Sequence, residues 1–234
     1  MCGRYTLLEP NLDSILKMET INELDDFTWT GRYNIAPFQN LPVFSLRKDG
    51  KIHLGLHHWD LIPSYTKDLK QKYKMINLKV ENITDPQKPY WNRLLKSQRC
   101  LIPVSGFYEW QMQPNSKIKK PYYIYLKNKK PFTLAGIWDH WNSPDGKPIQ
   151  SFTILTCPAN PLVAEIHNDK KRMPVILDKK EEQLWLDPNI NNLHQLEEVL
   201  RPYPSQKMEA YEVTTLVNNA RNDDPKCIDP NKHE

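Results

Sequence analysis

Hydrophobic and polar positions alternate along this chain in many short runs, which is the pattern of half-buried β-strands. Several of the runs are rich in β-branched and aromatic residues, which favour a pleated surface. Twenty prolines are spread over the 234 residues and indicate short elements joined by turns. The segments predicted as strands are 41–46, 51–58, 99–104, 107–112, 122–126, 132–137, 152–156, 174–177 and 210–213.

Helical periodicity is confined to a few segments. Asn11 is a suitable N-cap for a helix over 12–18. Apolar residues at helical spacing predict further helices over 89–96, 180–186 and 193–200. No linker divides the chain, so we predict one α+β domain over residues 1–217, mainly antiparallel sheet with short peripheral helices. The polar segment 218–234 is expected to form a loose tail.

Composition narrows the class of protein. Hydrophobic residues make up 39% and charged residues 26%, a globular balance. No apolar run approaches the roughly 20 residues of a membrane span, and no signal peptide is visible, so we expect a cytoplasmic protein without membrane contact. The four cysteines form no C-x-x-C pair and have no histidine at zinc-ligand spacing. We therefore expect no metal and no cofactor.

The basic residues are concentrated in the middle of the chain. The net charge is only +4, but nine basic and three acidic residues lie between Lys67 and Arg99. Six lysines and no acid lie between Gln111 and Trp138. This distribution is compatible with a polyanionic partner such as nucleic acid. The alternative is that these lysines only coat a solvated surface.

Cys2 is the residue with the most distinctive chemistry. Removal of Met1 would leave an α-amine and a thiol on the same residue. An α-amine titrates near pH 8, so part of it is nucleophilic at neutral pH. A 1,2-aminothiol reacts with an aldehyde to give first an imine and then a five-membered thiazolidine ring. The alternative is that Cys2 is a small buried hydrophobe, as most free cysteines are.

Ordered motifs around Cys2 add weight to this chemistry. The sequence Cys2-Gly3-Arg4-Tyr5 opens the chain, residues 106–110 read G-F-Y-E-W, and I-H at 166–167 is followed by R-M-P-V-I-L at 172–177. Together with R-Y-N-I-A-P at 32–37, this set resembles the SOS response-associated peptidase (SRAP) family, from residue 1 to about residue 217. The resemblance implies the barrel-like SRAP fold.

The resemblance also implies an activity. Family members sense abasic sites in single-stranded DNA and bind them covalently as a thiazolidine DNA–protein cross-link, which shields the lesion during the DNA damage response. The same cysteine removes its own Met1, so the enzyme is lyase-like and also an autoproteolytic cysteine peptidase. We expect a monomer of bacterial type, associated with the nucleoid when bound to DNA.

Four positions match the family's catalytic residues. Cys2 matches the nucleophile, and Asn77 matches the residue that orients the amine or the sugar. Glu109 matches the acid/base residue, and His167 matches the residue that assists sugar-ring opening and reversal of the cross-link. Taken singly, each has a plainer interpretation: Asn77 as a loop amide, Glu109 as an outward strand residue, and His167 as a helix-end histidine.

Candidate DNA contacts follow from charge and aromaticity, since single strands are held by cationic grooves and stacking faces. Arg4 and Arg172 are expected to bind phosphate, and Lys79 supplies a further positive charge. Trp59 and Tyr65 lie just before the basic segment that begins at Lys67 and are candidates for stacking on bases. Core packing is an equally good interpretation of Trp59.

The chain departs from the family pattern at several positions. Asp60 replaces a usual Gly, Tyr65 replaces a usual Trp, and Lys79 replaces a usual Arg. Four residues separate His167 from Arg172, more than in the shortest family members. Two other functions remain open: a non-covalent single-strand binder, and a cysteine peptidase acting on other proteins with His167 as base.

Overall fold

Five strands form a closed ring in the computed structural model, which describes residues 2–24, 28–68, 74–190 and 193–231. Neighbours in the ring are antiparallel, except for β5 and β11, whose parallel pairing closes it. The strands in ring order are β11 (Pro148–Pro158), β10 (Phe132–Asn142), β7 (Arg99–Val104), β4 (Asn40–Leu46) and β5 (Ile52–Trp59). The barrel-like α+β fold expected from the sequence is confirmed.

Short strands extend this barrel at its margins. Two of them pair with β11, and the others lie on β5 and β10. They are β6 (Asn77–Lys79) and β12 (Arg172–Pro174) on β11, β2 (Ile21–Asn22) on β5, and β13 (Ile176–Leu177) on β10. β6 and β12 carry residues of the candidate site, so β11 supports both sides of it.

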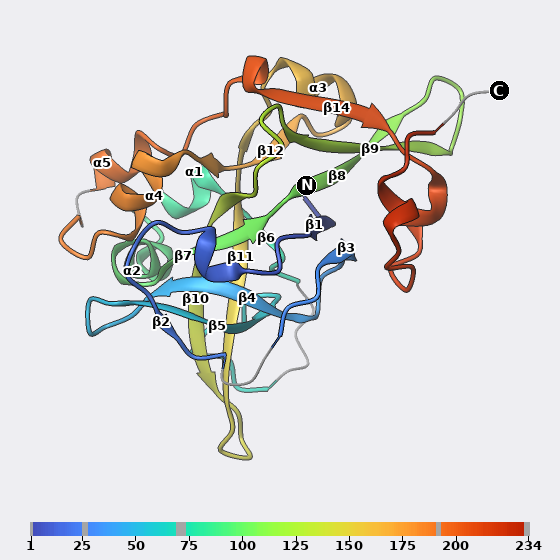
Figure 1. The fold of residues 1–234 in the computed structure, drawn as a ribbon. Helices are drawn as coiled ribbons and strands as arrows, with labels where there is room; N and C mark the ends of the chain where they lie inside the picture. The colour runs from blue at the N-terminus through green and yellow to red at the C-terminus, as the bar shows by residue number, and fades with distance from the viewer. Residues whose placement is uncertain (1, 25–27, 69–73, 191–192, 232–234) are drawn as a thin grey trace.

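A second, antiparallel sheet begins where the chain leaves β7 at Ser105 and continues as β8. Figure 1 shows β8, β9 and β14 crossing above β4 and β5 of the barrel. The strand order is β14 (Met208–Glu212), β9 (Lys119–Leu126), β8 (Gly106–Met112), β1 (Tyr5–Leu7) and β3 (Arg32–Ile35). β1 therefore lies between β8 and β3, which places the N-terminal segment inside the sheet.

Close packing inside the barrel requires glycine at one position. A Cβ atom on Gly136 of β10 would lie 2.5 Å from Ile102 Cδ1 and 2.8 Å from Thr153 O. Real side chains do not approach so closely, so any larger residue would force β10 away from its neighbours. Glycine at this position therefore allows β7, β10 and β11 to pack closely.

The helices are short and lie outside the barrel. α3 begins at Asn160, whose side chain accepts a hydrogen bond from Val163 N, followed by a proline at the first helical position. α4 begins with a complete capping box between Asp178 and Glu181. The helices are α1 (Val80–Ile83), α2 (Pro89–Ser97), α3 (Pro161–Ile166), α4 (Lys179–Leu186) and α5 (Leu193–Glu197). None of the helices in the described part of the chain is long and apolar enough to cross a membrane.

Two helix predictions need correction. Residues 12–18 form only a 3₁₀ turn over Leu12–Ser14, and the Asn11 side chain makes no capping hydrogen bond there. The helix predicted over 193–200 ends at Glu197. Both segments had apolar residues at helical spacing, but fewer than about 12 residues cannot sustain a helix without tertiary support.

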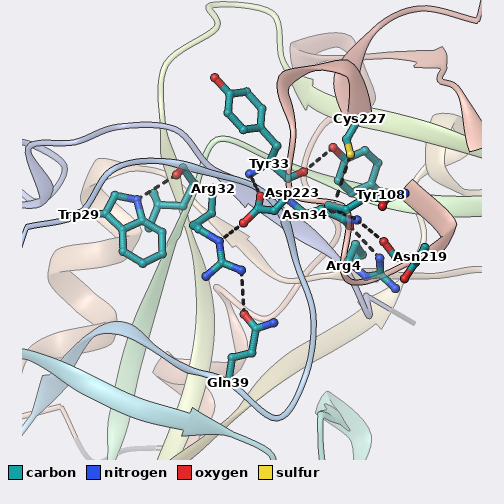
Figure 2. Close-up of polar contacts among 12 residues, drawn as sticks. Arg4, Trp29, Arg32, Tyr33, Asn34, Gln39, Tyr108, Asn219, Asp223 and Cys227 are labelled. Carbon is teal, nitrogen blue, oxygen red and sulfur yellow. Dashed lines mark hydrogen bonds and ion pairs between the residues drawn. The ribbon is translucent and has the colours of Figure 1, made fainter. Parts of the chain in front are cut away.

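The C-terminal segment 218–231 is ordered against the second sheet, so the prediction of a loose tail is wrong for these residues. The buried Asn34 of β3 donates from Nδ2 to the carbonyls of Val217, Asn219 and Asn222. Asp223 accepts from the backbone N–H groups of Tyr33 and Asn34 at 2.6 and 3.0 Å. Figure 2 shows this network, in which buried polar groups compensate for the low hydrophobicity of the segment.

Candidate functional site

Cys2 lies three residues before the start of β1 and is fully buried. Its Sγ is 3.9 Å from the carbonyl oxygen of Arg4, to which it donates a weak hydrogen bond. Burial, with a further contribution from the charge of Glu109, raises the pKa of the thiol to about 12. The sulfur is therefore a protonated thiol at neutral pH, and a base must remove its proton before it attacks an electrophile.

Asn77 is positioned by the parallel pairing of β6 with β11, where it lies opposite Ile154. Its Nδ2 donates to the carbonyl oxygen of Cys2 at 2.8 Å. Its Oδ1 is buried and accepts no hydrogen bond from the described residues. The side chain thus fixes the backbone of Cys2 and presents an acceptor for one more donor beside it.

Glu109 projects inward from β8, so the interpretation as an outward strand residue is wrong. β8 pairs with β1 at Tyr5↔Phe107, and continuing this antiparallel register places Glu109 opposite Gly3, the residue after Cys2. Glu109 is only 3% exposed, and burial raises the pKa of its carboxyl group. A raised pKa makes the populations of the protonated and ionised carboxyl more nearly equal at neutral pH, which suits a group that both accepts and donates a proton.

His167 lies at the C-terminal end of α3 and is also buried. Its Nδ1 is 2.8 Å from the carbonyl oxygen of Arg172 and 3.7 Å from Glu109 Oε1. A carbonyl can only accept, so Nδ1 carries a hydrogen. Asn77 contacts Cys2, Glu109 lies 3.7 Å from His167, and the charge of Glu109 acts on the Cys2 thiol, so the four predicted catalytic residues lie close together.

The arginines predicted to bind phosphate are occupied by protein groups. Arg4 donates from NH1 to Asn34 Oδ1 at 2.7 Å and to Val217 O at 2.6 Å. Arg172 forms a two-pronged ion pair with Glu81, with N–O distances of 2.5 and 2.8 Å, and also donates to the carbonyl of Thr156. Phosphate binding by either residue would compete with these contacts and stays a prediction.

Lys79 is the most available of the three predicted cations, because it is exposed at the N-cap position of α1. β6 lies parallel to β11 with Lys79 opposite Thr156, the residue whose carbonyl accepts from Arg172. Lys79, Glu81 and Arg172 therefore lie together at the edge of the catalytic group. This surface therefore carries charges of both signs and is not purely cationic.

The two candidate aromatic residues differ completely in exposure. Trp59 is fully buried, stacks on Phe152 and donates from Nε1 to Ile76 O, so its assignment as a base-stacking residue is wrong and the packing alternative holds. Its strand neighbours on the barrel wall leave no face for a ligand. Tyr65 is 68% exposed and meets Tyr90 edge to face, with ring centroids 5.0 Å apart.

Comparison with known proteins identifies the family. The family model "SOS response associated peptidase (SRAP)" matches residues 1–220. The chain belongs to the SRAP family. It is 40% identical to the abasic site processing protein YoqW of Bacillus subtilis, over 98% of this chain and 99% of that protein. It is 34% identical to the abasic site processing protein HMCES of Gallus gallus, over 85% of this chain and 66% of that protein.

Solved structures agree with this membership. A crystal structure of a protein from Bacteroides thetaiotaomicron superimposes with a TM-score of 0.84 and 25% sequence identity, over 99% of this chain and all of that one. A crystal structure of a protein from Bordetella bronchiseptica has the same fold, with a TM-score of 0.73 at 23% identity, over 91% of this chain and all of that one.

Sequence reasoning missed three residues of this SRAP protein's site. Asp169 Oδ1 lies 3.3 Å from His167 Nε2, Glu81 pairs with Arg172, and Asn34 binds Arg4. Asp169 follows His167 by two residues, so the sequence could have predicted that its carboxylate lies near the His167 ring. The other two contacts join segments that are distant in the sequence. Among the described residues, no group of three or more His, Cys, Asp or Glu side chains is placed to hold a metal ion.

Proposed function

We propose that this SRAP protein captures abasic sites in single-stranded DNA as a thiazolidine cross-link through Cys2, after Met1 has been removed. The observation that carries the proposal is the convergence of Asn77, Glu109 and His167 on the N-terminal cysteine. Relatives that align over nearly the whole chain are named abasic site processing proteins. The product would shield the lesion, in keeping with a cytoplasmic monomer that acts in the DNA damage response.

The first step opens the closed sugar. An abasic deoxyribose is mainly a cyclic hemiacetal, which has no free aldehyde. Its C1′–O4′ bond breaks as O4′ receives a proton from His167, and the C1′ hydroxyl gives its proton to the carboxylate of Glu109. The products are an aldehyde at C1′ and a hydroxyl at C4′. Histidine suits this step because its charge changes near physiological pH.

The nitrogen of Cys2 then attacks before the sulfur. Burial favours the protonated form of the thiol, whereas an α-amine titrates near pH 8. The amine adds to C1′ and a proton moves from nitrogen to oxygen, giving a carbinolamine. Glu109 protonates the hydroxyl, which leaves as water and gives an iminium ion. The thiol then loses its proton to Glu109 and closes the five-membered ring on C1′.

Asn77 orients the attacking nitrogen. Its Nδ2 holds the Cys2 carbonyl at 2.8 Å, and its buried Oδ1 accepts from none of the described residues. An N–H of the released α-amine, or a sugar hydroxyl, would satisfy this oxygen. The nitrogen lone pair would then face C1′.

We expect the DNA to contact the exposed side chains of Lys79 and Tyr65. Lys79 offers a positive charge at the edge of the site, and the exposed ring of Tyr65 offers a face for a base. Such contacts recognise the backbone and unstacked bases, so we expect little dependence on DNA sequence. They also make the initial, non-covalent binding weaker as salt increases.

A peptidase acting on other proteins is less well supported. Cys2 is buried and its thiol is protonated, so it is a weak nucleophile for an external peptide bond. Removal of the chain's own Met1 is different, because the scissile bond is held next to the thiol and the high effective concentration offsets the weak nucleophile.

The test is intact-protein mass spectrometry before and after mixing with a single-stranded oligonucleotide that carries one abasic site. We expect the chain without Met1, and an adduct whose mass equals protein plus DNA minus one water. Cys2→Ala should abolish the adduct, while Cys100→Ala, at a buried cysteine outside the site, should keep it. If the chain lacks Met1 and forms no adduct, the covalent function is excluded and salt-sensitive binding would favour a non-covalent binder.

A further inference from the structure

Asp169 lies in the four-residue segment 168–171, between His167 at the end of α3 and Arg172 at the start of β12. It is not one of the four residues that match the family's catalytic positions. The inference below rests on the proposed function, because it concerns how His167 delivers a proton to the sugar. Asp169 belongs to the segment 168–171, which is longer here than in the shortest family members.

The segment is held rigidly at both ends. Asn168 Oδ1 accepts from Met112 N and Asn168 Nδ2 donates to Met112 O, each at 3.0 Å, so its side chain joins the end of β8. Lys171 adopts a left-handed conformation with φ 48°, and its N–H donates to the His167 carbonyl at 2.8 Å. Its own carbonyl accepts from Ala159 N at 2.9 Å. The loop therefore fixes Asp169 at one place.

The Asp169 carboxylate lies between His167 and Lys119 of β9. Oδ1 is 3.3 Å from His167 Nε2, and Oδ2 is 3.1 Å from Lys119 Nζ. Partial burial alone would raise the pKa of Asp169. The hydrogen bond from Lys119, with the charges of Lys119 and His167, more than offsets this and holds the pKa below its usual value. Asp169 therefore carries a full negative charge at neutral pH.

The His167 ring thus faces an acceptor at each nitrogen. Nδ1 donates to the Arg172 carbonyl, and Nε2 faces the Asp169 carboxylate. A neutral ring with its hydrogen on Nδ1 would turn the lone pair of Nε2 toward a negative charge. A ring with a hydrogen on both nitrogens is attracted to both partners.

We infer that Asp169 is a positioning residue that holds His167 with a proton on each ring nitrogen, so that the Nε2 proton is ready for the ring oxygen of the abasic sugar. Transfer of that proton accompanies cleavage of the C1′–O4′ bond and leaves His167 neutral, with its hydrogen on Nδ1. Asp169 remains a carboxylate throughout. Neither residue forms a bond to the DNA.

The other charged groups around the ring do not cancel this effect. Glu109 of β8 lies 3.7 Å from Nδ1 and, where ionised, adds a second negative charge. Lys119 of β9 is paired with Asp169, and Arg172 of β12 is paired with Glu81 of α1. Glu165 of α3 is exposed. The charge of Arg172 is therefore offset by Glu81, and Lys119 lies at Oδ2 of Asp169, whereas Oδ1 of Asp169 faces His167 Nε2.

The first measurement follows the His167 ring by NMR over pH 5–9 in the free protein, for the unmodified sequence and for Asp169→Asn. The Asn side chain keeps the shape of Asp and removes its charge. The His167 titration midpoint should fall by about one pH unit, the usual effect of losing an opposite charge at this distance. Asp145→Asn, in the exposed β10–β11 turn, should leave it unchanged. An equal midpoint in Asp169→Asn and the unmodified protein overturns the inference.

The second measurement is the rate of cross-link formation with abasic single-stranded DNA over the same pH range. In Asp169→Asn the alkaline limb of the rate profile should move to lower pH by about one pH unit, so that the rate at pH 8 falls up to about tenfold. Combined with His167→Gln, Asp169→Asn should cause no further loss, because it acts through His167. If the rate losses of the two single variants multiply in the double variant, the assigned role is overturned. It is also overturned if Asp169→Asn shifts the His167 midpoint but leaves the pH profile of the rate unchanged.

The two measurements separate this inference from the proposed function. If the unmodified protein forms no adduct at any pH, the proposed function fails, and the role of Asp169 in that reaction fails with it. If the adduct forms normally but the His167 midpoint is the same in Asp169→Asn, only the inference about Asp169 fails.

Discussion

At the scale of single residues, burial decides the chemistry of the site. Glu109 is 3% exposed, and this burial raises the pKa of its carboxyl group. Burial also raises the pKa of the Cys2 thiol, to about 12. Burial costs more for a charged group than for a neutral one, so it shifts both groups toward their protonated forms. Each group can then donate a proton during the reaction, Glu109 to the leaving hydroxyl and the thiol to Glu109 during ring closure.

Glu109→Gln tests this directly. A carboxyl whose pKa is higher in the folded than in the unfolded state favours folding least at high pH, because the folded state must then bury a charge. The stability of the unmodified protein relative to Glu109→Gln should therefore fall between pH 5 and pH 8, measured as the difference in Tm. The cross-linking rate of the variant should fall by about 10²–10⁴-fold, the usual range for a general acid/base.

The matched control is Glu209→Gln, at a β14 carboxylate that accepts from Tyr125 at the protein surface. It should leave the cross-linking rate unchanged. A Tm difference for Glu109→Gln that is the same at pH 5 and pH 8 would contradict a raised pKa for Glu109.

At the scale of elements, buried Arg99 joins α2 and α4 to the barrel. It begins β7, and its guanidinium donates to the carbonyls of Leu95 and Lys96 at the end of α2. It also donates to the carbonyls of Trp185 and Asp187 at the end of α4. Burial lowers the pKa of Arg99 to about 10, which still leaves it charged at neutral pH. A cation at two helix C-termini also complements their dipoles.

Arg99→Met should therefore destabilise the fold by about 3 kcal/mol, because several buried carbonyls lose their donor while the apolar volume is kept. The measurement is the free energy of unfolding from urea titration. Lys96→Met, at an exposed position of α2, should change it by less than about 0.5 kcal/mol. Equal stabilities for Arg99→Met and the unmodified protein would exclude this role.

At the scale of the whole molecule, the two ends of the chain stabilise each other. Arg4 and Asn34 near the N-terminus bind the carbonyl of Val217, and Asp223 binds the backbone of β3 (Figure 2). β3 pairs with β1, which begins three residues after Cys2. The C-terminal segment thus helps to hold the strand that presents the nucleophile.

Asp223→Ala should loosen this junction. The backbone N–H groups of Tyr33 and Asn34 lose their acceptor, and Arg32 loses its ion pair. We expect hydrogen exchange at Tyr33 and Asn34 to rise by at least about tenfold, which corresponds to about 1.4 kcal/mol of lost protection. Asp229→Ala, an exposed position of the same segment, is the control. Unchanged exchange at both amides in Asp223→Ala would show that the segment does not hold β3.

The sequence by itself determined the local structure and the identity of the reactive groups. Alternation located the longer strands, and the ordered motifs identified Cys2, Asn77, Glu109 and His167 as a set. These features are visible because strand periodicity and motif spacing are local properties of the chain. β1, β2, β3 and β6 have only two to four residues, which is too short to show a period, and so they were missed.

Only the tertiary structure decided which of these groups are buried and what they contact. The pairing of β5 with β11 closes the barrel across about ninety residues of sequence and buries Trp59, so its ring cannot stack on a base. The same distant contacts occupy Arg4 with Asn34, pair Arg172 with Glu81 and order the C-terminal segment. Burial and charge pairing depend on residues that are far apart in the chain, and one sequence does not show which of them meet.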